Sequence, residues 1–340
     1  MDFRLTDDQT ALTTQVRDYL TETHGADVLR RLDAGRGEDG AIWDGLTALG
    51  LPGVCAPEAV GGLGLGCVDA VLIATECGRA CLAEPLVDTA LVAATWLAKA
   101  GRAEDLAGVA DGTAKVALVH AINPWIAGLA DATHVLAPSS TSGRAPLMTK
   151  ADFLQRFPSA GEALVSVDPL RALSRRPEID ADDALLLDLA ALMSAAQLVG
   201  LAEAMLAQAT AYAGDRRQFG QPIGAFQAVK HQLASALVAI EFARPVVWRA
   251  AQALDDGCAH AAVAISHAKI AAGDAAISTA EVAIQTHGAM GYTYEVDLHF
   301  WMKRAWALNG AWGERAFHTA RIDAAVIGGA MPIGPDHTFA

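Results

Sequence analysis

The most specific stretch of this 340-residue sequence is Tyr212-Ala213-Gly214-Asp215-Arg216-Arg217-Gln218-Phe219-Gly220-Gln221-Pro222-Ile223, followed by Phe226-Gln227. Apolar residues then recur at helical spacing, and Pro222 suits a first helical turn. They are Phe226, Val229, Leu233, Leu237 and Ile240. The stretch therefore opens a long helix, which Pro245 is expected to kink or break.

The residues around this stretch, from about 183 to 326, are strongly helical in pattern. A long alanine-rich run extends from Ala259 to His287 and stops at Gly288, and a further run extends from about Val296 to Leu308. Alanine is the best helix former, and glycine often ends helices. Long helices joined by short connections are typical of a four-helix bundle.

The first half of the chain divides into a helical part and a β-prone part. Thr6 is a good cap for a helix that carries Leu12, Val16 and Leu20 on one face. Short β-prone runs then lie between Ser, Gly and Pro clusters, at Val116–Val119, His134–Leu136 and Leu164–Val167. We therefore predict a mainly α protein with an N-terminal helical domain (1–112), a shortened middle β domain (113–182) and a C-terminal bundle (183–340).

Composition and charge narrow the class of protein. The formal net charge of −14 argues against a nucleic-acid partner, which requires a basic face. The acidic N-terminus does not resemble a secretory signal, and the longest apolar runs fall short of the ~20 residues that a spanning helix needs. We expect a cytoplasmic protein with no membrane insertion. Five cysteines in an unpaired pattern predict reduced, buried thiols and no metal site: Cys55, Cys67, Cys77, Cys81 and Cys258.

Five motifs in the same order resemble the acyl-CoA dehydrogenase family over some 280 residues. They are the opening helix (1–20), Trp43 to Ala70, Glu76 to Leu86, Tyr212 to Gln227, and Gln285 to Tyr292. The resemblance implies an N-terminal helical domain, a middle β-barrel and a C-terminal four-helix bundle. It also implies dimers or dimers of dimers with FAD at the subunit interface, and an electron-transfer flavoprotein as electron acceptor.

The resemblance implies α,β-dehydrogenation of an acyl-CoA thioester. A base, usually a glutamate of raised pKa, removes the α-proton. The flavin accepts the hydride, while the protein binds and orients the reacting groups. Hydrogen-bond donors stabilise the enolate charge that develops on the thioester carbonyl.

The same resemblance assigns candidate FAD-binding residues. Arg216 matches the arginine that pairs with the pyrophosphate of a neighbouring subunit's FAD, and a guanidinium suits phosphate oxygens. Gln218 and Phe219 match residues that lie against the same cofactor. The loop for the adenine and ribose end is matched by Gln285, Gly288, Ala289 and Gly291. The alternatives are an ordinary surface arginine, helix-end packing and a plain helix stop at Gly288.

The glycine-rich run Gly61-Gly62-Leu63-Gly64-Leu65-Gly66 does not follow a clear strand. A dinucleotide-binding fingerprint requires that context. We therefore interpret this run as a structural loop.

The catalytic base is missing from both positions where the family carries it. One family position falls on Trp312 or Gly313 according to the placement of a gap, and the other falls on Ala190. None of these side chains accepts a proton. Glu314 is the nearest candidate, with a solvated acid at a helix start as its alternative reading, and Asp188 lies on a different helical face from Ala190.

The middle domain is also shorter than the family barrel, and Asn123-Pro124-Trp125 matches the family's flavin-side strands poorly. Losing the base and barrel while keeping the Arg216 and Gln285 motifs resembles the short subunit of α2β2 acyl-CoA dehydrogenases of actinobacterial steroid degradation. This resemblance implies a longer partner subunit with which FAD is shared. The alternatives are a homo-oligomeric dehydrogenase with a relocated base and a flavin-free scaffold or regulatory subunit.

Overall fold

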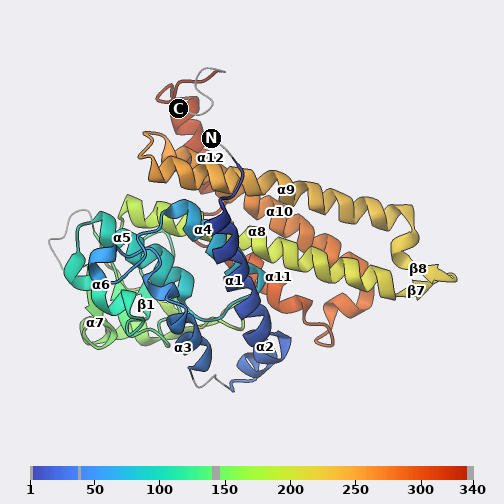
Figure 1. The fold of residues 1–340 in the computed structure, drawn as a ribbon, viewed down its shortest axis with the longest axis horizontal. Helices are drawn as coiled ribbons and strands as arrows, with labels where there is room; N and C mark the ends of the chain where they lie inside the picture. The colour runs from blue at the N-terminus through green and yellow to red at the C-terminus, as the bar shows by residue number, and fades with distance from the viewer. Residues whose placement is uncertain (1–2, 37–39, 140–145, 335–340) are drawn as a thin grey trace.

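The structure is a computed structural model that describes residues 3–36, 40–139 and 146–334. A layer of N-terminal helices and two small sheets lie against one half of a long helical bundle (Figure 1). The other half of the bundle projects away from them and ends in a short hairpin. The mainly α fold with a reduced middle β segment is confirmed. Residues 1–2 and 37–39 of the predicted N-terminal domain, 140–145 of the middle domain and 335–340 of the bundle domain lie outside the described residues.

The N-terminal layer begins with α1 (Asp7–Thr23), whose start is capped as expected. The Thr6 hydroxyl accepts from the Gln9 amide, and the Gln9 side chain accepts from the Thr6 amide, each at 3.1 Å. This reciprocal capping box satisfies two amides that the helix leaves free. The other α-helices of this layer are α2 (Ala26–Asp33), α3 (Ala41–Ala48), α4 (Cys67–Arg79), α5 (Ala94–Lys99) and α6 (Ala103–Ala110).

Between α4 and α5 the chain forms a π-helical segment, η3 (Val87–Ala93). π-Helical segments are rare in proteins, and those that occur are often found at functional sites. The glycine-rich run lies before α4 as a loop whose amides are already occupied. Leu63 N donates to Gly53 O, Gly64 N to Ala56 O and Leu65 N to Val54 O. Because these donors are bonded within the chain, the run cannot serve as a phosphate cradle.

The middle segment forms two three-stranded sheets. One has the order β1 (Val116–Leu118), β3 (His134–Leu136), β4 (Leu147–Thr149), and the other has the order β2 (Trp125–Ala127), β6 (Leu173–Arg175), β5 (Ala163–Leu164). The strand expected at 164–167 was wrong in extent, because pairing with β6 ends at Leu164 and Val165 is 98% exposed. The short helix α7 (Lys150–Arg156) was not anticipated.

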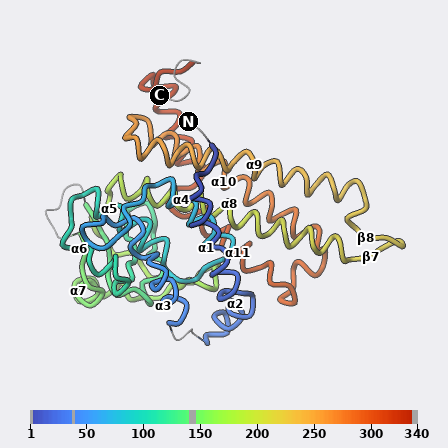
Figure 2. Tube along the Cα trace, viewed as in Figure 1, coloured from blue at the N-terminus to red at the C-terminus, as the bar shows by residue number. Residues whose placement is uncertain are grey.

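Five helices follow: α8 (Ala184–Asp215), α9 (Gln227–Asp255), α10 (Ala261–His287), α11 (Leu298–Gly310) and α12 (Arg315–Val326). Helices α8, α9 and α10 run beside one another along the bundle (Figure 2). The expected break at Pro245 is not observed, because α9 continues through it. Buried Ala243 and Val247 flank the proline, so packing holds the helix together despite the lost hydrogen bond.

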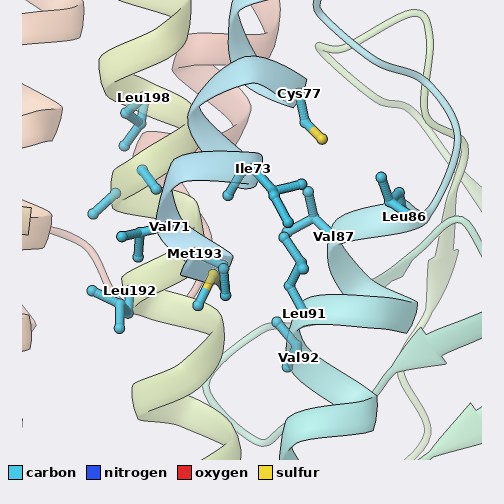
Figure 3. Packing of buried hydrophobic residues seen from close by; sticks show 14 of the residues in the cluster. Val71, Ile73, Cys77, Leu86, Val87, Leu91, Val92, Leu192, Met193 and Leu198 are labelled. Carbon is cyan, nitrogen blue, oxygen red and sulfur yellow. The ribbon is translucent and has the colours of Figure 1, made fainter. Parts of the chain in front are cut away.

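Helix α8 is the centre of the core. It is long and apolar enough to cross a membrane by length and composition, but 83% of its most apolar window is buried inside the fold. Its residues Leu192, Met193 and Leu198 lie beside α4 (Figure 3), and the segment η3 packs against both helices. Burial against these neighbours accounts for its apolar composition.

Two glycines bring α4 and α8 into backbone contact. A Cβ on Gly78 would collide with the Gln197 carbonyl, and a Cβ on Gly200 would collide with the Thr75 carbonyl. A second tie comes from Asp255 at the end of α9, whose carboxylate accepts from the amides of Cys67 and Val68 at the start of α4. The N-terminal layer and the bundle therefore share one hydrophobic core.

Candidate functional site

The candidate FAD-binding residues gather at one end of the bundle. We call this region the bundle tip, defined as Arg216–Phe219 after α8 and Gln285–Gly291 at the end of α10. The strands β7 (Arg217–Gln218) and β8 (Gln221–Pro222) form its hairpin. Stacking of the Tyr212 and His287 rings, with centroids 4.4 Å apart, joins the two halves. Two motifs far apart in sequence thus lie together.

The hairpin half of the bundle tip points its groups away from the chain. Arg216, Gln218 and Phe219 are all exposed, and Phe219 is 92% exposed with a left-handed φ of 51°. Within the described residues Arg216 forms no ion pair. Its guanidinium is therefore available to an anion, and Phe219 offers an uncovered ring.

The α10 half of the bundle tip combines a helix end with an exposed turn. Gly288 has a φ of 59°, which favours glycine, and it ends α10 as the plain-stop interpretation also requires. The exposed residues here are Gln285, Gly288 and Ala289. Gly291 is buried, and a Cβ at this position would lie only 2.9 Å from Ile284 O. Gly291 is thus needed for packing within the chain.

A second feature is a cavity of about 350 Å³ between the middle segment and the bundle. Helix α8 lines it with a stripe of four residues at helical spacing: Ala190, Met193, Ser194 and Gln197. The π-helical segment η3 contributes Val87, Asp88 and Val92. Further walls come from β2, from the loop between β5 and β6, and from the end of α11 with the turn that follows it.

Both positions of the missing base face this cavity. Ala190 lines it from α8, and Trp312 lines it from the turn after α11. Glu314 does not line it and lies exposed at the N-cap of α12. Asp188 also lies outside the lining and pairs with Arg321 at 2.8 Å. Burial raises the pKa of Asp188, although the nearby Arg321 opposes that shift.

Among the described residues, the two carboxylates that line the cavity are each held by an arginine. Asp88 pairs with Arg171, and Asp168 pairs with Arg304, whose side chain is 3% exposed. Arg304 also donates through Nη1 to the Leu82 carbonyl at 2.8 Å, while its Nη2 has no partner. Each carboxylate is thus already engaged by a neighbouring guanidinium within the chain.

Trp312 is fixed in an unusual conformation. Its φ is 58°, a left-handed value that is rare for a bulky residue. Its amide donates to Asn123 Oδ1 at 2.9 Å, and its carbonyl accepts from His318 Nε2 at 3.0 Å. Burial lowers the pKa of His318 to about 4, so the ring is neutral at pH 7. Hydrogen bonds at both the amide and the carbonyl of Trp312 thus hold this backbone conformation in the cavity wall.

Family comparisons match most of the chain. Residues 6–109 match the acyl-CoA dehydrogenase N-terminal domain, and residues 184–327 match the acyl-CoA dehydrogenase C-terminal domain. The chain belongs to the acyl-CoA dehydrogenase family. Members of this family are FAD-dependent oxidoreductases. The two matched ranges leave residues 110–183, the segment of the two small sheets, between them.

Similar proteins include acyl-CoA dehydrogenase IpdE2 from Mycobacterium tuberculosis, 34% identical over 79% of this chain and 81% of the relative. Two solved structures share the fold. The Tcur3481-Tcur3483 steroid enzyme has a TM-score of 0.78 at 26% identity, covering 96% of this chain and 99% of that one. The ChsE4-ChsE5 complex from Mycobacterium tuberculosis has a TM-score of 0.81 at 23% identity, with the same coverage.

The bundle tip of this acyl-CoA dehydrogenase chain fits part of a FAD molecule. The unpaired Arg216 suits a pyrophosphate, and the exposed Gln285 amide suits the hydroxyl and ring nitrogen atoms of adenosine. Bound FAD supplies the hydride acceptor of the family reaction. The described residues hold no group of three His, Cys, Asp or Glu placed for a metal ion.

Sequence reasoning missed most of the cavity. No sequence motif marked the two ion pairs, Trp306 or the polar side chains of α8. Arg304 does, however, lie close in sequence to the region where the family carries its base. The one available signal was the stripe of small and polar residues on α8. The cysteines are free, four of them buried, as expected for reduced thiols.

Proposed function

We propose that this chain is a catalytically incomplete acyl-CoA dehydrogenase subunit that completes the FAD site of a longer partner. One contrast carries the proposal. The cavity holds no free base at either family position, whereas the bundle tip presents an unpaired Arg216 and an exposed Gln285. A residue turned outward in this way serves a cofactor held largely by another chain.

The outer surface of α9 supports assembly with a partner. Leu237, Val238 and Phe242 are exposed there, and Phe219 is exposed on the neighbouring hairpin. An apolar surface of this kind marks a protein interface. ChsE4-ChsE5, which shares the fold, is by name a complex of two different chains. We therefore propose an α2β2 assembly with one FAD shared by each pair of unlike chains.

The substrate we propose is an acyl-CoA thioester with a steroid acyl group. The support is the likeness to the Tcur3481-Tcur3483 steroid enzyme. By the family resemblance, the partner's base removes the α-proton and an electron-transfer flavoprotein accepts the electrons. We propose a cytoplasmic location for the complex.

Expression alone and expression with a longer acyl-CoA dehydrogenase chain test the assembly. The chain alone is expected to be colourless and inactive, and the co-expressed complex is expected to be yellow and active. A yellow, active protein made alone would instead assign a relocated base to this chain. A stable complex without FAD would make the chain a scaffold.

Arg216→Ala tests the shared cofactor. A hydrogen bond to a charged group contributes roughly 1.5–3 kcal/mol, so FAD retention by the complex should weaken by about ten- to a hundredfold. Arg217→Ala is the matched control, since Arg217 is the adjacent exposed arginine. Equal FAD content in the two variants would reject the role of Arg216, and the exposed position predicts unchanged folding in both.

A further inference from the structure

The cavity has features of a ligand-binding site beyond those expected of an active site that has only lost its base. Three of the seven tryptophans of the chain line it: Trp125, Trp306 and Trp312. Tryptophan rings present broad apolar faces that favour flat or ring-containing molecules. The lining also includes the π-helical segment η3 and the left-handed Trp312, and irregular backbone of both kinds is frequent at functional sites.

Buried polar side chains in the cavity leave hydrogen-bonding groups unused by the described part of the chain. Ser194 is 2% exposed, and its hydroxyl forms no hydrogen bond within the described part of the chain. Other helical hydroxyls, such as those of Ser266 and Thr279, donate to the carbonyl four residues before them. Ser194 is therefore an exception in the wall of a cavity. A buried hydroxyl left unpaired is unfavourable unless a ligand or water bonds to it.

Two amides beside Ser194 add to this polar group. Gln197, one helical turn further along α8, makes only a long 3.5 Å contact from its amide nitrogen to Met193 O. Asn123 uses Oδ1 to accept from Trp312, and its amide nitrogen has no partner among the residues described. The cavity thus offers a neutral hydroxyl and two amides beside the two ion pairs of its lining.

The charges that line the cavity cancel. Asp88 and Asp168 are balanced by Arg171 and Arg304, and no other charged residue among those described takes part in the lining. Arg304 keeps one buried donor, Nη2, without a partner. An anionic ligand would have to compete with the two carboxylates for the arginines. The cavity therefore favours a neutral molecule.

We propose that this cavity binds a neutral ring-containing molecule that carries one hydroxyl or carbonyl group, and holds it without converting it. The rings of the ligand lie against Trp125 and Trp312, and its polar group bonds to Ser194 and Gln197. The volume of about 350 Å³ is within the range of small-molecule sites. The inference concerns this chain's own cavity and does not depend on the shared FAD site.

The test compares 2-naphthol, naphthalene and 2-naphthoate by equilibrium dialysis against the full-length chain. We expect saturable binding of 2-naphthol at one site per chain. Naphthalene, which lacks the hydroxyl, should bind about fivefold more weakly, as expected for one lost neutral hydrogen bond. The 2-naphthoate anion should bind at least as weakly as naphthalene. Equal affinity for all three probes, or a preference for 2-naphthoate, overturns the proposal.

Two variants locate the site. Ser194→Ala should remove the preference for 2-naphthol over naphthalene and leave naphthalene binding unchanged, while Ser235→Ala, on the exposed surface of α9, should behave as the parent. Ala190→Phe should weaken both probes at least tenfold by filling the cavity. If Ser194→Ala keeps the full preference, the polar contact is wrong. That outcome counts against the proposal even if Ala190→Phe fails to fold.

Discussion

Replacing Arg304 with methionine leaves the Asp168 carboxylate buried without its counter-charge. Each side chain of this pair is 3% exposed, so water cannot solvate the charge that remains. Loss of one partner of a buried pair costs about 3–5 kcal/mol. The Leu82 carbonyl also loses its donor, which adds about 1 kcal/mol. Since domains unfold at about 5–15 kcal/mol, this single change removes a large part of the stability.

The double variant Arg304→Met/Asp168→Leu separates the pair from its surroundings. Removing both charges leaves no unpaired ion, and apolar replacements of buried pairs are often close to neutral. We expect Asp168→Leu alone to cost a similar amount to Arg304→Met. The double variant should then be at least about 3 kcal/mol more stable than the sum of the two single losses predicts.

Urea titrations followed by tryptophan fluorescence and circular dichroism measure these differences. Arg175→Met is the control, because the Arg175–Glu162 pair is 55% and 57% exposed and should leave the denaturation midpoint unchanged. Additive losses in the double variant would refute the reasoning. So would a loss in Arg304→Met no larger than that in Arg175→Met.

Three further changes are informative. Glu314→Gln should leave turnover of the co-expressed complex within about twofold, because Glu314 is exposed and outside the cavity; a thousandfold drop would place the base on this chain. Burial lowers the pKa of Lys269 to about 7, so the unfolded chain binds more protons between about pH 7 and 10.5. The free energy of unfolding of the parent, relative to that of Lys269→Met, should therefore rise by on the order of 2–3 kcal/mol from pH 7 to 9 in urea titrations. A relative free energy of unfolding that falls over this range contradicts the prediction. A thiol-reactive disulfide dye should label only Cys258 in the folded chain and all five cysteines after unfolding. The reason is that burial raises the pKa of the other four thiols, those of Cys55, Cys67, Cys77 and Cys81. Labelling of a second thiol in the folded chain would contradict this prediction.

Local signals explain which parts of the fold were predictable. The Thr6 cap, the apolar stripe of α9 and the glycine stop after His287 are each encoded within a few residues. The middle sheets are not, because their strands have two or three residues and pair across long separations, as in Trp125 with Arg175. A three-residue strand carries too little alternation to be distinguished from a loop.

The two candidate sites differ for the same reason. Arg216 and Gln285 stand in continuous motifs, so their resemblance to the family could be read directly. The cavity is assembled from six or more segments, and Asp168 and Arg304 are 136 residues apart. Only the folded chain brings Ala190 and Trp312 to one cavity and thereby shows that both lost base positions open into the same space.

The close backbone contacts of Gly78 with Gln197 and of Gly200 with Thr75 have a consequence for how such chains diversify. With no side chain between the two backbones, α8 has a single axial and rotational setting against α4. The stripe from Ala190 to Gln197 is therefore presented to the cavity at a fixed angle, whatever residues it carries. Substitutions along that stripe can resize the pocket without shifting the scaffold, whereas a methyl group at either glycine would displace the whole helix.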